Sequence, residues 1–309
     1  MRRDDAERLL ELSRDADFLG PDTATWIERL TPQREKLAKA VRFLVEDKAE
    51  AEAAELAANI WRLWLMSGDI EGGRALLATA LDSGAAQPSR ARALALYADG
   101  VLAFRQGAQD ESQKRNEAAL AAARAVGDLE AESLALVGLS RVAFRNGDYA
   151  RVRTLALEAR RLVHDLEPTA RVAPLHLLAA GTRLAGELDE AVALYEESLE
   201  LNRRIGDHRM VAVELHNVGH VELHRANIQK AERCFAEYVE LHNPNDPYDA
   251  AMTKLDQAAL ALARGEANRA LELLRGSEST LQGAGIVLDP DDAFEVDRLH
   301  ESLAAEGIV

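Results

Sequence analysis

The fold is decided by a short stretch in the last third of the chain, residues 215–235, which reads LHNVGHVELHRANIQKAERCF. Apolar residues recur at helical spacing on both sides of Ala226 and Asn227. A helix that ends in a tight turn needs a residue that takes the left-handed backbone conformation, and Asn is the best choice after Gly. The stretch therefore predicts two helices joined by a turn, with the turn shifted by one residue to Asn227.

The same turn recurs along the chain at a nearly constant interval. The aligned turn positions are Gly68, Gly107, Gly147, Gly186, Ala226 and Gly265, at steps of 39, 40, 39, 40 and 39 residues. A second kind of turn lies between them, where Gly127 and Gly206 can end one helix and Asp128 and Asp207 can cap the next. One helical hairpin cannot bury its apolar stripe alone, so the pattern predicts stacked hairpins.

This pattern resembles the tetratricopeptide repeat (TPR). The family's signature positions are matched by Leu215, Asn217, Val218, Gly219, Ile228, Ala231 and Phe235. The longer period and the flanks 25–81 and 283–308 resemble a narrower group, the C-terminal repeat domain of bacterial STAND ATPase transcription regulators of the LuxR and SARP types. The chain lacks the GxxxxGK[ST] phosphate loop of those ATPases. The resemblance thus implies a sensor or scaffold module without the ATPase and DNA-binding domains.

The repeats predict an all-α protein, a TPR-like right-handed superhelix of about six helical hairpins with capping helices at both ends. The predicted domains are an N-terminal helical cap over 1–48, with helices near 3–15, 22–30 and 32–47; repeats over 49–285; and a C-terminal capping helix within 286–309. That last helix is expected to begin after Asp289, with Pro290 at its first position. Trp61 and Trp64 are expected to pack between the N-terminal cap and the first hairpin.

Composition excludes several classes of function. The chain has 309 residues and a formal net charge of −16, which disfavours binding of nucleic acid by the surface as a whole. Its single cysteine, Cys234, excludes an intrachain disulfide and a zinc site built on cysteines, and it is expected to be packed rather than reactive. The N-terminal residues lack the apolar region of a signal peptide, and no apolar run is long enough to span a membrane. These features predict a cytoplasmic protein.

The sequence predicts neither an enzyme nor a cofactor. It contains no Gly-rich nucleotide loop, no nucleophile elbow and no metalloprotease motif. His216, His220 and His224 follow one another at a spacing of four, so a neighbouring pair can clamp a metal ion. All three cannot share one ion on a straight helix, and a third ligand would have to come from elsewhere. A metal site or enzyme based on these histidines is therefore the weaker alternative, and no metal ligand is predicted.

The TPR register favours another interpretation of the histidines. With the turn residue numbered fifteen, the resemblance implies that positions 5, 9 and 13 of each first helix line a concave groove that contacts ligands. The groove residues predicted to bind a ligand are Arg62, Tyr97, Arg105, Arg141, Arg145, His176, His216, His220 and His224. No position of this set is Asp or Glu in any of the six units. In so acidic a chain this indicates a neutral-to-basic groove.

The predicted ligand is an acidic peptide, tail or protein surface. Arginine forks suit carboxylate or phosphate groups, and Tyr97 offers a flat apolar contact beside them. Arg105 and Arg145 also have a simpler interpretation, because cations are favourable at helix C-termini. Sensing of a small-molecule signal is the alternative function, since the resembled regulators sense signals through such domains. Direct contact with nucleic acid or a membrane is not expected.

Overall fold

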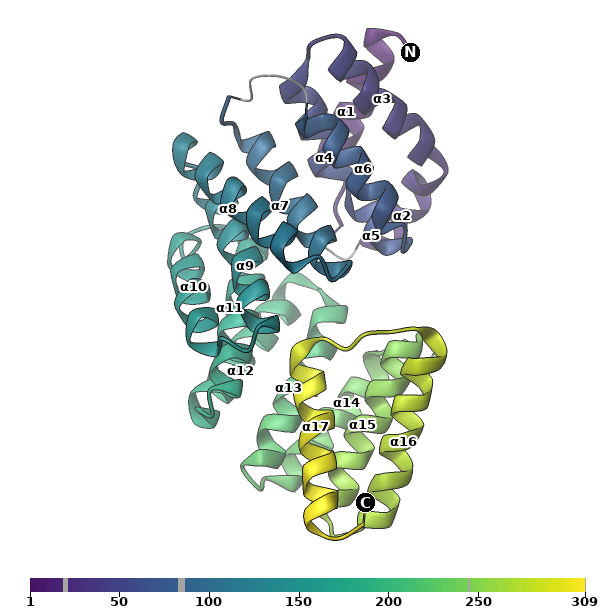
Figure 1. Ribbon diagram of the computed structural model, residues 1–309, viewed down its shortest axis with the longest axis vertical. Coiled ribbons are helices and arrows are strands. Elements are labelled where there is room, and N and C mark those ends of the chain that lie inside the picture. The colour runs from purple at the N-terminus through teal and green to yellow at the C-terminus, as the bar shows by residue number, and fades with distance from the viewer. Residues whose placement is uncertain (19–21, 83–86, 244, 309) are drawn as a thin grey trace. The chain divides into compact units, whose positions relative to one another are not determined.

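The computed structural model describes residues 1–18, 22–82, 87–243 and 245–308. All regular secondary structure in these residues is helical, so the predicted all-α fold is confirmed (Figure 1). The chain divides into two compact units. The N-terminal unit comprises Met1–Asn146 and Arg151–Pro174, and the C-terminal unit comprises Gly147–Ala150 and Leu175–Val309.

The first half of the chain starts with three helices and a short 3-10 turn, followed by hairpins. The elements are α1 (Arg3–Arg14), α2 (Thr23–Leu30), η1 (Thr31–Gln33), α3 (Arg34–Glu46), α4 (Glu50–Ile60), α5 (Arg62–Met66), α6 (Ile70–Leu81), α7 (Arg90–Arg105), α8 (Gln109–Val126), α9 (Leu129–Arg145) and α10 (Tyr149–Leu162). Trp61 and Trp64 are buried in the core of the N-terminal unit, as predicted. The guanidinium of Arg34, on α3, lies over the ring of Trp64, which ties the early helices to the first hairpin.

The second half of the chain continues the hairpins and ends with a single helix. The elements are α11 (Pro168–Leu184), α12 (Leu188–Ile205), α13 (His208–His224), α14 (Ile228–Leu241), α15 (Pro247–Ala263), α16 (Ala267–Ala284) and α17 (Pro290–Ala305). Helix α17 begins at Pro290, as predicted, and packs against α15 and α16 (Figure 1). Val296, Leu299 and Leu303 of α17 join the apolar core of the C-terminal unit. Cys234 is half-buried beside that core, and burial raises the pKa of its thiol.

The turns follow the sequence pattern with one correction. Gly127 and Gly206 end their helices in the left-handed conformation, and the Asp128 and Asp207 side chains accept hydrogen bonds from the next helices, as predicted. In the fifth unit, however, the left-handed residue is Ala226 (φ 63°) and not Asn227 (φ −90°). The shift to Asn227 is wrong because the Asn227 backbone N–H already closes the turn on the carbonyl of Glu222, at 2.8 Å.

Small residues allow the two helices of a hairpin to approach closely. Gly219 on α13 faces the ring of Phe235 on α14, and a Cβ atom at Gly219 would lie 2.3 Å from that ring. Between neighbouring hairpins of the N-terminal unit, a Cβ atom at Gly138 of α9 would likewise lie 1.9 Å from the Asn116 side chain of α8. The glycine at 219 and the aromatic residue at 235 are thus two halves of one packing contact.

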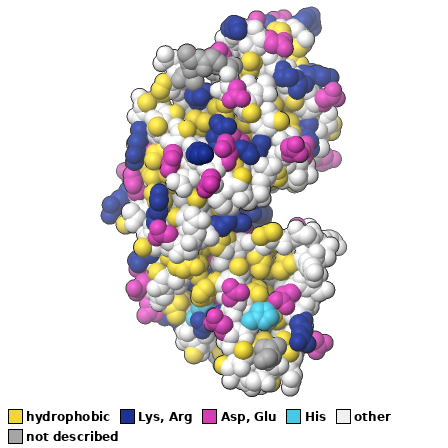
Figure 2. All heavy atoms as spheres, in the orientation of Figure 1, with side chains coloured by type: hydrophobic (Ala, Val, Ile, Leu, Met, Phe, Trp, Pro, Cys, Tyr) yellow, Lys and Arg dark blue, Asp and Glu magenta, His cyan; other side chains and the backbone are white. Residues whose placement is uncertain are grey.

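Acidic and basic side chains are interspersed over the visible face of the N-terminal unit (Figure 2). Ion pairs also join helices of this unit, such as Arg14 with Glu55 and Arg124 with Glu158. Among the described residues, none of the helices combines the length and the apolar character that crossing a membrane requires.

Candidate functional site

The predicted groove residues of the N-terminal unit form a cluster on three successive first helices, α5, α7 and α9. The guanidinium carbon of Arg62 lies 4.6 Å from the centre of the Trp61 ring. The rings of Trp61 and Tyr97 meet edge to face at 6.5 Å. Arg141 donates a hydrogen bond to the Tyr97 hydroxyl at 3.2 Å. We call Arg62, Tyr97 and Arg141, with Trp61, the arginine face.

The arginine face concentrates positive charge. Arg62 and Arg141 are half-buried, and in the described ranges no carboxylate forms an ion pair with either side chain. Burial lowers the pKa of Arg62, and the positive charge of Arg141 lowers it further, whereas Tyr97 and Asp17 act in the opposite direction. Two guanidinium groups that repel each other in a partly dehydrated setting favour an anion beside them.

The other two predicted arginines lie further along the same helices. Arg145 of α9 places its guanidinium 4.3 Å from the centre of the Phe104 ring, a cation–π contact between α9 and α7. Arg105 is exposed at the last residue of α7, which suits the negative end of the helix dipole.

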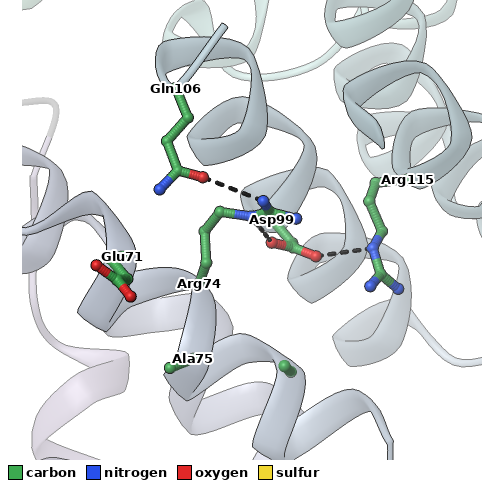
Figure 3. Close-up of a pocket in the computed structure, with 7 residues that line it drawn as sticks. Glu71, Arg74, Ala75, Asp99, Gln106 and Arg115 are labelled. Atoms are coloured by element: carbon green, nitrogen blue, oxygen red, sulfur yellow. Dashed lines mark hydrogen bonds and ion pairs between the residues drawn. The ribbon is translucent and has the colours of Figure 1, made fainter. Parts of the chain in front are cut away.

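Figure 3 shows the hollow on the N-terminal unit, of about 280 Å³, that α6, α7 and α8 line. One of the residues that line the hollow is Asp99, which is only 1% exposed. Its carboxylate forms ion pairs with Arg74 at 2.9 Å and with Arg115 at 2.8 Å. Arg74 also donates to the side chain of Gln106 at 3.1 Å. These charged side chains neutralise one another, so we interpret the residues that line the hollow as a structural ion-pair network between hairpins.

The predicted groove residues of the C-terminal unit are His176, His216, His220 and His224, which we call the histidine face. His176 Nδ1 lies 3.1 Å from Glu214, a fully buried residue of α13 that also accepts a hydrogen bond from Ser198 at 2.6 Å. His216 and His220 are buried, with exposed fractions of 5% and 0%, and His224 is half-buried. They therefore face protein rather than solvent.

Carboxylates lie against the ring nitrogens of the histidine face. His216 Nδ1 and His220 Nε2 both lie 2.9 Å from Asp256 Oδ1 of α15. Helix α17 supplies Asp292, which is 3.0 Å from His216 Nε2, and Glu295. Glu295 Oε2 lies 3.2 Å from His220 Nδ1 and 3.0 Å from His224 Nε2.

A buried arginine completes this cluster. Arg183 of α11 pairs with Glu295 and donates to the Asn217 side chain at 2.6 Å. Burial alone would lower the pKa of Arg183, but the charge of Glu295 outweighs it and the pKa is raised. Burial would raise the pKa of Glu295, yet Arg183 and His220 hold it well below its usual range.

The remaining pKa shifts follow from the same balance of burial and charge. Burial alone would lower the pKa of His216, but Asp256 and Asp292 raise it well above its usual value. Burial lowers the pKa of His224 despite the hydrogen bond to Glu295. Burial and the neighbouring charge of Asp292 raise the pKa of Asp291 to about 6, although the charge of Arg183 acts in the opposite direction.

The carboxylates of this site were not predicted from the sequence. The positions 5, 9 and 13 are free of carboxylates, but Asp256 follows position 5 of the sixth unit, and Asp292 and Glu295 belong to the terminal helix. Their signal in the sequence is a pair of acidic residues on the helix face that also carries Val296 and Leu299. Acidic groups on a buried face require cationic partners.

The repeats are recognised by comparison with a known family. A tetratricopeptide repeat family profile matches residues 171–243. The fold is of the tetratricopeptide repeat type. TPR folds generally serve as non-catalytic scaffolds for protein interaction. Among curated proteins, none matches the chain.

Solved structures show the same fold at low sequence identity. A Rap protein complexed with the competence and sporulation factor has a TM-score of 0.64 and 15% identity, covering 96% of this chain and 78% of its own. NprR in complex with its cognate peptide NprX has a TM-score of 0.61 and 15% identity, covering 96% and 82%. PilF of Pseudomonas aeruginosa has a TM-score of 0.54 and 17% identity, covering 81% and 99%. At such identities the similarity establishes the fold alone.

Proposed function

We propose that this TPR chain is a non-enzymatic, cytoplasmic interaction module whose arginine face binds a carboxylate-bearing peptide or protein segment. The observation that carries the proposal is the pair Arg62 and Arg141, two half-buried guanidiniums without a carboxylate ion-pair partner in the part of the chain that the structure describes. A planar guanidinium offers parallel N–H donors that match a carboxylate. Trp61 and Tyr97, whose rings are buried, contact these guanidinium groups and hold them in place.

The histidine face is a poorer candidate for the same role. Its positions match those of the arginine face in the repeat, but Asp256, Asp292 and Glu295 already lie against it. An incoming acidic segment would have to displace α17 and leave Arg183 buried without its partner, which costs several kcal/mol. The acidic ligand therefore binds at the N-terminal unit.

The comparisons support a peptide ligand. NprR, of similar fold, is described with its cognate peptide NprX, and the Rap protein with the competence and sporulation factor. We place the module in bacterial signalling or transcriptional regulation, on the resemblance of the period and flanks to regulator repeat domains. Sensing of a small anionic signal at the same guanidinium pair is the second form of this proposal, because a metabolite carboxylate fits the same donors.

The test uses a short fluorescent peptide rich in Glu, and the same peptide with Gln in place of Glu. The unchanged protein is expected to bind the Glu peptide more tightly, and the Arg62→Glu/Arg141→Glu protein is expected to lose that preference by at least tenfold. The control is Arg161→Glu, a charge reversal on the exposed side of α10. Fluorescence anisotropy measures binding, and circular dichroism confirms the fold.

Two outcomes contradict the proposal. Equal affinity for both peptides shows that carboxylates are not recognised. Undiminished binding by the double variant shows that the ligand lies elsewhere. A thermal-shift screen against anionic metabolites separates the two forms of the proposal, because a small ligand raises the unfolding temperature of the unchanged protein and not of the double variant.

A further inference from the structure

We propose that the C-terminal unit also binds one divalent transition-metal ion, of the zinc class, through His216 and His220 of α13 and Asp256 of α15. This site is independent of the arginine face. It supplies the third ligand that the histidine spacing alone left open, because Asp256 comes from the next hairpin.

The three donor groups converge on one point. His216 Nδ1 and His220 Nε2 lie on either side of Asp256 Oδ1, each 2.9 Å away, and one donor atom from each residue lies within 4.8 Å of the others. Ligand atoms around one tetrahedral zinc ion are about 3.3 Å apart, so a slight opening of the cluster admits the ion. All three residues are at least nine-tenths buried, which keeps competing water away.

Several polar atoms of the cluster lack a hydrogen-bond partner. His216 Nδ1, His220 Nδ1 and Asp256 Oδ2 are buried and make no hydrogen bond within the described residues, and the short approach of His216 Nδ1 to Asp256 does not have hydrogen-bond alignment. Buried polar atoms of this kind are rare in folded proteins, because each one loses its hydration without replacement. A bound ion would coordinate His216 Nδ1 and remove that cost at this nitrogen.

The outer nitrogens of the two rings show the arrangement that surrounds metal-bound histidines. His216 Nε2 lies 3.0 Å from Asp292, and His220 Nδ1 lies 3.2 Å from Glu295. A neutral imidazole has one N–H donor, so a ring with carboxylates at both nitrogens is satisfied as an imidazolium or with a metal on one nitrogen. In the second case Asp292 accepts from the outer N–H of His216 and orients that ligand, and Glu295 lies close to the outer nitrogen of His220 without hydrogen-bond alignment.

Charge balance favours a dication. Metal ligation requires neutral imidazoles, and in that state Arg183 compensates one of the three carboxylates of Asp256, Asp292 and Glu295, which leaves two buried negative charges for the ion. Asp291 adds a third buried negative charge when its carboxyl group is ionised. Uncompensated buried charges are costly, and a divalent ion offsets two of them. Two imidazoles with one carboxylate suit zinc-class ions, whereas Mg²⁺ and Ca²⁺ prefer oxygen ligands throughout.

The first experiment titrates untagged full chain, stripped with a chelator, with Zn²⁺ in a calorimeter and measures metal content after dialysis. One Zn²⁺ per chain is expected, and Mg²⁺ is expected not to bind. His220→Ala and Asp256→Ala are expected to lose binding, while Asp292→Asn weakens it roughly 10–100-fold. The matched control is His300→Ala, whose imidazole pairs with Glu278 on the surface, and it is expected to bind as the unchanged protein does.

The second experiment needs no substitution and therefore stays valid if a variant fails to fold. Co²⁺ bound to the unchanged protein is expected to show a visible spectrum of nitrogen and oxygen ligands without a thiolate band, and Zn²⁺ should displace it. The competing explanation is that His216 and His220 are imidazolium ions. Absence of stoichiometric Zn²⁺ binding, with all four ring nitrogens protonated in ¹⁵N NMR, overturns the proposal. Unchanged binding by a folded His220→Ala protein overturns it as well.

Discussion

The arginine face and the histidine face occupy the same positions of the repeat, yet their surroundings differ. In the N-terminal unit, Arg62 and Arg141 contact Trp61 and Tyr97, and no carboxylate ion pair with either arginine is present in the described residues. In the C-terminal unit, the chain supplies its own carboxylates through Asp256 and α17. Equivalent positions in a repeat therefore share a direction but not a function, which depends on what packs against them.

The terminal helix α17 is the reason that the C-terminal unit contains buried charge. Helix α17 brings apolar side chains to the core of the C-terminal unit, together with Asp292 and Glu295. Once these carboxylates are dehydrated, they require cationic partners, which Arg183 and the histidines provide. The interaction that the sequence predicted with an external acidic partner is made in this unit by the protein's own terminal helix.

The largest expected effect contrasts one arginine from each unit. Arg183→Met leaves Glu295 buried without its cation and is expected to lower the free energy of unfolding by about 3–5 kcal/mol. Arg141→Met removes one hydrogen bond to Tyr97 and is expected to cost about 1 kcal/mol. Urea unfolding followed by circular dichroism measures both, with exposed Arg209→Met as the control. Equal losses of unfolding free energy in Arg183→Met and Arg141→Met would contradict the proposed difference between the histidine face and the arginine face.

A smaller effect concerns the excess of carboxylates beside α13. The pKa of Asp291 in the folded protein is about 6, above its unfolded value, so ionisation of Asp291 destabilises the fold as pH rises from about 4 through 6. In metal-free protein, Asp291→Asn is expected to raise stability by roughly 1–3 kcal/mol above pH 7, and to have almost no effect near pH 4. The control is Asp297→Asn on the exposed side of α17. A gain that is independent of pH would contradict this explanation.

The smallest effect compares turns of the two units. Ala226 is left-handed in the C-terminal unit, whereas the equivalent turn of the N-terminal unit has Gly107 with φ 78°, where an added Cβ would meet no atom within 4 Å. Ala226→Gly is expected to stabilise the protein by about 1 kcal/mol, and Gly107→Ala to destabilise it by about as much. Thermal unfolding measures both. A destabilised Ala226→Gly protein or a stabilised Gly107→Ala protein would show that the backbone conformation does not set the residue preference at these turns.

Local patterns predicted most of the fold. The 39- and 40-residue steps between turns placed the hairpins, and the cap residues Asp128 and Asp207 act as expected. The bounds of α1, α2 and α3 agree with the predicted helices to within two residues. These features depend on neighbours within one or two helical turns, which a sequence displays directly.

The site was predicted only in part, because its partners are distant in the chain. The register identified the three histidines of α13 and the arginines Arg62 and Arg141, but His216 meets Asp292 across 76 residues and His220 meets Asp256 across 36. No period or motif links such pairs, so the sequence displayed the basic groups without their acidic partners. For the same reason, Asp256 could not be predicted from the sequence as the third ligand of the proposed metal site.

The amino-acid sequence by itself determined the helices, the turns and the direction in which each groove residue projects, because these depend on spacing along one helix. The tertiary structure was needed to show that, within the residues it describes, no carboxylate forms an ion pair with the arginine face, whereas α17 covers the histidine face. The physical reason is dehydration, because a carboxylate buried in an apolar core needs a cationic partner. In the C-terminal unit these partners are the histidines and Arg183.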